Sequence, residues 1–226
     1  MPIFVSMNNL TFLIYLKIVM KLKLPNIIPI FPLSGVIYFP KTNLPLNIFE
    51  PRYLALINAS LRTNKYLGLI QPKKNTSDVY SVGCLGKITE NTQTKDGRLL
   101  INLIGITRFE IETEINNDKS YREFQVSYNK FKEDLDEKKE QLNKIEELPD
   151  KTKSFFKRNG LLLNWKEFEK LDQDQRINTL AMIAPISDEE KQTILESINV
   201  KSKTKILSEI IEFYSHNNGD NNQTIQ

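Results

Sequence analysis

The segment most like a catalytic motif is the run Gly83-Cys84-Leu85-Gly86-Lys87-Ile88, in which a lysine follows two glycines. A Walker-type phosphate loop needs a longer spacing between its glycines, and a serine or threonine after the lysine to hold magnesium. Here the lysine is followed by isoleucine, and the whole run lies within a strand-like pattern. We therefore expect no nucleotide site in this segment and no bound cofactor.

Side chains that could act as nucleophiles, bases or metal ligands are not grouped in the sequence. Cys84 is the only cysteine and His216 the only histidine, and the histidine lies in a polar C-terminal stretch. A cysteine without a nearby base has no means of forming a reactive thiolate. The carboxylates Glu110, Glu112 and Glu114 alternate with apolar residues, which is typical of the solvated face of a strand and not of a metal cage. We expect no metal site, although an unrecognised serine-lysine hydrolase stays open as an alternative.

Composition narrows the class of protein. The 226 residues carry 31 basic and 28 acidic side chains, so a net charge of +3 disfavours a nucleic-acid-binding surface. A single cysteine forms no internal disulfide, which favours a cytoplasmic location. The apolar run at residues 10–20 is shorter than the ~20 residues that cross a bilayer. It also lacks a leading positive charge and a small-residue cleavage site, so we expect neither a membrane span nor a signal peptide.

Residues 25–130 have the pattern of a β domain. Apolar and polar side chains alternate through residues 99–103, 109–115 and 123–128, and Asp96-Gly97 is a favoured hairpin turn. Prolines at 29, 32, 40 and 45 predict bent edge strands. Pro51 followed by apolar residues up to Leu61 predicts one helix inserted among the strands.

Residues 131–216 change to helical spacing. Ser187 and Glu190 form a capping-box pair that begins one helix, and Phe155 and Phe156 are expected to pack in the interior of this helical domain. Residues 217–226 are predicted to be a disordered tail. Residues 1–24 are predicted to be an extension, with Met20 as the alternative start of the protein.

Two segments carry a family resemblance: IPIFPLSGVIYFP at residues 28–40 and LPLNIFEPRY at residues 44–53. They resemble the opening of the Lon protease N-terminal domain, with its Phe-Pro turn and its Pro-Leu-x-Ile-Phe-Glu-x-Arg-Tyr signature. Val82-Gly83-Cys84, Asp96-Gly97-Arg98, Gly105 and Arg108-Phe109 follow in the order that this family shows. The helical half is similar to small bacterial stand-alone proteins of the family. Lys41 departs from the pattern, because a glycine is usual there.

The resemblance implies an α+β fold: a PUA-like pseudo-β-barrel with one inserted helix, followed by an all-helical C-terminal domain. In Lon this region helps capture unfolded substrate, while separate domains hydrolyse ATP and peptide. We therefore expect a non-catalytic recognition protein, without the ATPase and Ser-Lys peptidase of Lon, acting in protein quality control. Its expected partners are unfolded or apolar polypeptides, together with a protease. An RNA-binding role is the alternative, since other PUA-like barrels bind RNA; the oligomeric state stays open.

The signature residues have a structural and a functional interpretation. In the structural one they build the fold, with Glu50 capping the inserted helix and Arg108 forming a bidentate pair with Glu50. In the functional one, Phe49, Arg52, Tyr53 and Arg108 border a groove for an extended or apolar peptide. The residues expected to serve the fold are Pro32, Leu33, Phe39, Pro40, Pro45, Leu46, Ile48, Glu50, Gly83, Gly105 and Phe109.

Overall fold

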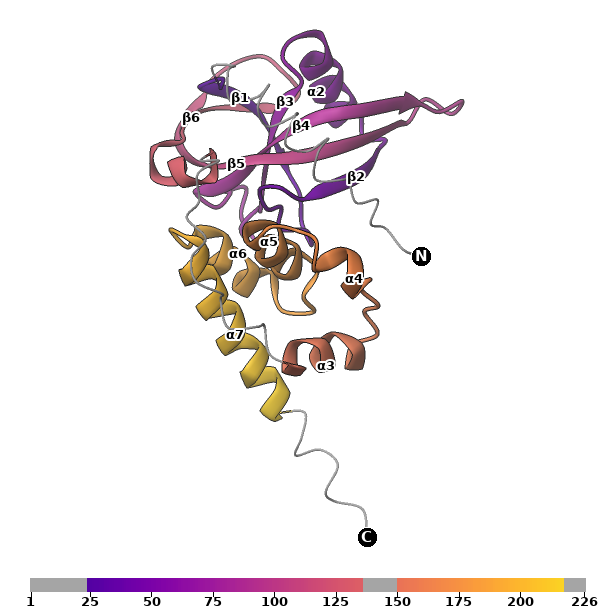
Figure 1. Cartoon of the computed structure of the whole chain (residues 1–226). Helices are drawn as coiled ribbons and strands as arrows, with labels where there is room; N and C mark the ends of the chain where they lie inside the picture. Colours follow the sequence, from indigo (N-terminus) through magenta and orange to yellow (C-terminus); the bar gives the residue numbers. More distant parts are fainter. Residues whose placement is uncertain (1–23, 136–149, 218–226) are drawn as a thin grey trace. The chain divides into compact units, whose positions relative to one another are not determined.

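The computed structural model describes residues 24–135 and 150–217, which fall into two compact units (Figure 1). The first unit extends to Leu135, so it includes residues that we had expected at the start of the helical domain. The predicted extension at residues 1–24 and tail at residues 217–226 lie outside the described residues, apart from Leu24 and Asn217.

The first unit is a six-stranded sheet with the order β2-β5-β4-β3-β1-β6 and an added β5–β6 pairing. That pairing joins β5, β4, β3, β1 and β6 into a closed ring, while β2 lies beside β5 (Figure 1). All pairs are antiparallel except β1 with β3. The strands are β1 Ile27–Pro32, β2 Asn43–Ile48, β3 Tyr66–Ile70, β4 Val82–Gln93, β5 Leu99–Ile115 and β6 Arg122–Ser127.

The predicted β domain is therefore a pseudo-barrel, and its longest strand is β5, with 17 residues. The two alternating stretches at residues 99–103 and 109–115 are parts of this one strand. They are joined through Gly105, where a Cβ atom would overlap the carbonyl of Phe39. The β4–β5 register shifts beside this point, between Leu85 and Gly86, as expected for a strand that bends to close a barrel.

Apolar side chains fill the interior of the first unit. Phe109 is buried at its centre, and the backbone of β3 and β4 approaches its ring at Gly68 and Gly83. Only a residue without a Cβ allows this approach, because an added methyl group would overlap the ring in both cases. The cluster around Phe109 includes Ile28, Ile30, Tyr66, Ile70, Leu85, Ile104, Ile106, Phe124 and Val126.

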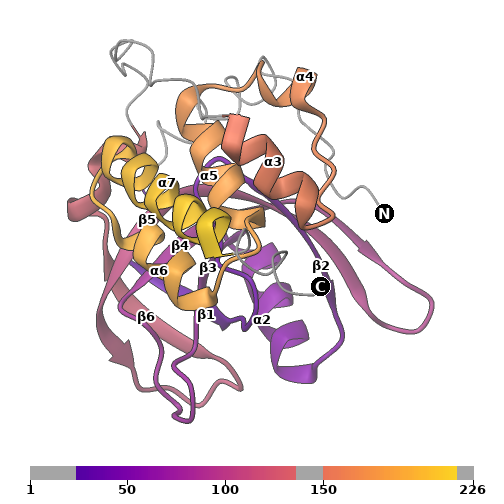
Figure 2. The same ribbon diagram turned by 90° about the horizontal axis from the view of Figure 1, so that it is seen from below.

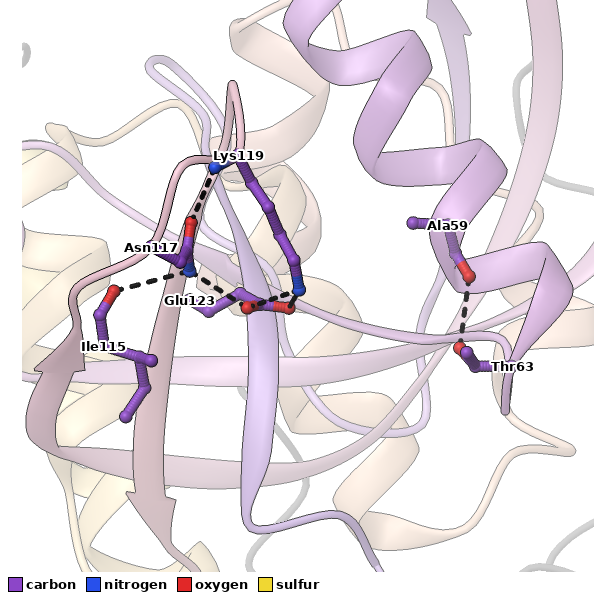
Figure 3. A network of polar contacts seen from close by, with 6 residues as sticks. All are labelled: Ala59, Thr63, Ile115, Asn117, Lys119 and Glu123. Carbon is purple, nitrogen blue, oxygen red and sulfur yellow. Dashed lines mark hydrogen bonds and ion pairs between the residues drawn. The ribbon is translucent and has the colours of Figure 1, made fainter.

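The inserted helix, α2, spans Pro51–Arg62 with Pro51 in its first turn, as predicted. It buries Tyr53, Leu56 and Ile57. At its end the Thr63 hydroxyl donates to the Ala59 carbonyl at 3.2 Å (Figure 3). This bond satisfies an acceptor that the helix itself leaves without a partner.

The turn between β5 and β6 is held by a compact polar network (Figure 3). The Glu123 carboxylate accepts hydrogen bonds from Asn117 Nδ2 at 3.0 Å and Lys119 Nζ at 2.7 Å. Asn117 Oδ1 in turn accepts from the Lys119 backbone N–H at 2.9 Å. These bonds stabilise the turn that brings β6 back onto β5.

The second unit is helical (Figure 2). Its last helix, α7, packs against α3, α5 and α6. The Ser187–Glu190 capping box is present, and Phe155 and Phe156 are buried, as predicted. In the described residues, no helix combines the length and the hydropathy that a membrane crossing requires. The helices are α3 Asp150–Arg158, α4 Trp165–Phe168, α5 Gln173–Ile183, α6 Asp188–Glu196 and α7 Val200–Asn217.

Candidate polypeptide-binding surface

The candidate surface lies at the end of β2, where the chain leaves the sheet and enters α2. Phe49 is 63% exposed there. The Arg98 guanidinium of the β4–β5 hairpin lies over its ring, 6.0 Å from the centroid. Leu100 of β5 is 45% exposed and lies across from Asn47. The surface therefore presents two apolar side chains, one directly after β2 and one on the neighbouring strand β5.

Arg52 and Tyr53 form the side of this surface that connects it to the core. The Tyr53 ring stacks on Phe31, with centroids 4.0 Å apart and planes at 19°, and the Arg52 guanidinium lies 4.4 Å from the Tyr53 centroid. The Tyr53 hydroxyl donates to the Pro32 carbonyl at 3.3 Å. Burial raises the pKa of the Tyr53 phenol above its ordinary value. Tyr53 is thus a buried residue that packs beneath Arg52, whereas Phe49 and Arg52 are accessible to a ligand.

Glu50 pairs with Arg52 and does not cap the helix. Arg52 Nη2 lies 3.0 Å from Glu50 Oε2, and the Glu50 carboxylate makes no capping hydrogen bond. The backbone carbonyl of Glu50 accepts from the N–H groups of Tyr53 and Leu54. The expected side-chain cap was therefore wrong, because the chain itself places the neighbouring guanidinium within reach of the carboxylate.

Arg108 does not pair with Glu50 and does not border the surface. It is 1% exposed, and its Nη2 and Nε atoms donate to the two oxygens of Asp134, each at 2.8 Å. Its backbone N–H also donates to Asp134 at 3.0 Å, and its guanidinium stacks 4.1 Å from the Phe131 centroid. Both partners lie on η1 (Asn129–Leu135), a short helical segment that follows β6. Arg108 holds this segment against β5, so we no longer assign it a contact with peptide.

Most of the other signature residues serve the fold. Phe39, Ile48 and Phe109 are buried, Leu33 donates its N–H to Ile70, and Pro45 and Leu46 lie in β2. Pro40 is buried and Pro32 ends β1. Pro45 lies on the edge strand β2, as predicted. β1 is not an edge strand as a whole, but Pro29 pairs only with β6 and Pro32 only with β3.

Lys41 occupies the position where glycine is usual, and it adopts the backbone conformation that explains this preference. Its φ is 60°, in the left-handed region. Its N–H donates to the Gly105 carbonyl at 2.8 Å, which holds the turn against β5. The turn geometry expected of a glycine is thus kept with a lysine in its place.

Charged side chains near the barrel pair with one another. Glu110 pairs with Lys130 at 2.8 Å and Glu114 with Arg122 at 2.6 Å, so these carboxylates lie on a solvated face, as their alternation predicted. Among residues 24–135 and 150–217, no group of three or more His, Cys, Asp or Glu side chains could hold a metal ion. The accessible features of the surface are therefore apolar contacts and neutralised ion pairs.

Two residues of the surface were missed from the sequence. Leu100 had a usable signal, because its position between Leu99 and Ile101 places it on the outward face of an alternating strand. The sequence places Arg98 only beside the hairpin turn, and no pattern in it indicates the contact with Phe49.

Comparisons with known proteins agree with this fold. The model of the ATP-dependent protease La (LON) substrate-binding domain matches residues 27–212. A Lon protease of Elusimicrobium minutum is 26% identical over 201 residues, covering 83% of this chain and 24% of that protein. The chain spans about a quarter of the length of such curated relatives.

Solved structures show the same fold. A Lon N-terminal domain protein from Xanthomonas campestris superposes with a TM-score of 0.61 at 19% identity, covering 81% of this chain and 97% of that one. The N-terminal domain of the Mycobacterium avium complex Lon protease superposes with a TM-score of 0.58 at 15% identity, covering 82% and 98%. The α+β architecture predicted from the sequence is thereby confirmed.

Proposed function

Because this chain belongs to the family of ATP-dependent protease La (LON) substrate-binding domains, we propose that it binds unfolded or apolar polypeptide segments in protein quality control. The observation that carries the proposal is the exposure of Phe49, directly after β2, and of Leu100 on the neighbouring strand β5. Exposed apolar side chains that lie together in one patch are typical of sites where another polypeptide is bound. Recognition, and not catalysis, is the proposed role of the module.

A protease is the proposed partner to which a bound segment would be delivered. The support for this is that the relatives found by sequence are Lon proteases, of which this chain matches about a quarter. RNA binding is the less favoured alternative, because Arg98, Arg122 and Lys130 each face a carboxylate. Cations that are already paired offer little to a phosphate backbone.

The experiment is a titration of the chain with a fluorescent unfolded polypeptide and with single-stranded RNA, each at low and moderate salt. We expect polypeptide binding with a Kd near micromolar, about −8 kcal/mol, because ordering a flexible segment opposes the gain from apolar burial. Apolar contacts should make this Kd depend little on salt, whereas phosphate contacts would make RNA binding fall steeply with salt.

Two variants locate the site. Phe49→Ala should weaken polypeptide binding about tenfold, since a central exposed aromatic side chain commonly contributes about 1–2 kcal/mol. Phe213→Ala is the matched control, because Phe213 is 61% exposed and lies on α7 in the other unit. Equal loss in both variants, or salt-sensitive RNA binding without polypeptide binding, would contradict the proposal.

A further inference from the structure

β2 is a strand with an unpaired edge. It pairs with β5 from Asn43 to Ile48, and in the part of the chain that the structure describes no strand pairs with its other side. Each remaining strand has a partner on both sides over part of its length, because the β5–β6 pairing closes the ring, although β4 beyond Ile88 pairs only with β5. The free edge is six residues long, and it runs directly into Phe49.

The free edge carries a defined set of backbone groups. Side chains of β2 alternate, with Leu44 and Ile48 buried and Pro45 and Asn47 exposed. Proline has no N–H to give to a ladder, so within sheets it lies where its nitrogen faces an unpaired edge. If the Pro45 nitrogen faces outward, the alternation of an antiparallel strand turns the N–H groups of Asn43 and Asn47 outward as well. The edge then offers two donors, the N–H groups of Asn43 and Asn47, and three acceptors, the carbonyls of Asn43, Pro45 and Asn47.

We propose that an extended, uncharged polypeptide segment binds by adding a strand to the free edge of β2. This inference rests on the proposed function, and it specifies how the polypeptide is held. Backbone donors and acceptors in a row are complementary to another strand, and a helix has no free backbone groups to match them. Phe49, which directly follows β2, then lies beside the side chains of the added strand.

The charges around the surface define the class of segment. Arg52 pairs with Glu50 at 3.0 Å and Arg98 with Asp96 at 2.9 Å, so the charged groups that flank Phe49 are already neutralised. A charged segment would lose hydration without gaining a free counter-charge. The edge therefore favours a neutral segment with apolar residues at alternate positions and without proline in its paired stretch.

The test uses three peptides of the same alternating apolar sequence. One is unmodified, and each of the other two is N-methylated at every second residue, in opposite phases. Strand addition uses the N–H groups of only one phase. We expect one methylated peptide to bind about tenfold more weakly than the unmodified peptide and the other to bind nearly as well. Equal binding of all three would overturn strand addition and leave the proposed function intact. Failure of the unmodified peptide to bind at all would contradict both.

A backbone change in the protein gives the reciprocal test. Asn47→Pro removes one outward N–H and should weaken binding of the unmodified peptide about tenfold, whereas the control Asn47→Ala, which keeps the N–H, should not. Thermal unfolding of both variants checks that each one folds. If Asn47→Pro does not fold, the methylated peptides alone decide whether the peptide binds by strand addition. Sedimentation of the unliganded chain tests whether a second copy of the chain, and not a peptide, pairs with the edge of β2. A dimer that Asn47→Pro dissociates without affecting peptide binding would assign the edge to a second copy and overturn the inference.

Discussion

Replacing Asp134 with alanine should destabilise the first unit by about 3–5 kcal/mol, which is the usual cost of removing one partner of a buried ion pair. Asp134 is 6% exposed and accepts three hydrogen bonds from Arg108, at 2.8, 2.8 and 3.0 Å. Alanine would leave a guanidinium and a backbone N–H in the interior without this acceptor. The loss is large against a total stability of about 5–15 kcal/mol for a domain.

The double variant Arg108→Met, Asp134→Leu separates the charge effect from packing. It should cost less than Asp134→Ala, because no unpaired charge is left behind. Glu110→Ala is the matched control. Glu110 pairs with Lys130, so it also joins β5 to η1, but both side chains are more than one-third exposed. Its loss should cost under about 1 kcal/mol.

The assay must report on the first unit alone, because two units need not unfold together. Trp165 is the only tryptophan and belongs to α4, so its fluorescence reports on the helical unit. Hydrogen exchange of the β5 amides, followed by mass spectrometry across a urea series, reports on the barrel. A cost for Asp134→Ala no larger than that of Glu110→Ala would refute the assignment of Arg108 and Asp134 as the contact that holds η1.

Three further outcomes follow from the fold. Lys41→Gly should raise the free energy of unfolding by about 0.5–1 kcal/mol. It removes left-handed backbone strain of about 1–2 kcal/mol from the folded state, and this gain exceeds the cost of the greater conformational entropy that glycine gives the unfolded chain. An unchanged or lower urea midpoint would count against this. Gly83→Ala should destabilise the barrel by about 1–3 kcal/mol, since a methyl group there meets the Leu69 carbonyl and the Phe109 ring, and wild-type stability would show that β3 and β4 can separate without cost. Burial raises the pKa of the Tyr128 phenol above its ordinary value of 10.0, so the neutral form stabilises the fold. That contribution to the free energy of unfolding is complete below pH 10 and is lost as pH rises above it. Urea unfolding at several pH values should therefore show a smaller alkaline loss of stability for Tyr128→Phe than for the unchanged protein. Equal losses in the two proteins would contradict this assignment.

Much of the local structure could be predicted from the sequence. Alternation of apolar and polar residues located β5 and β6, Pro51 placed the start of α2, and the Ser187–Glu190 pair placed the start of α6. These features depend on neighbours within a few residues, and a sequence pattern contains such neighbours. The exposure of Leu100 was also contained in that alternation.

Only the tertiary structure decided the partners of the polar residues and the open edge. Arg108 meets Asp134, 26 residues away, because η1 turns back onto β5 after β6 ends. β2 has a free edge because β6 and β2 pair with different stretches of β5, and only β6 is paired again on its far side. The register of distant strands sets each of these contacts, and loop closure between distant segments leaves no local pattern in the residues themselves.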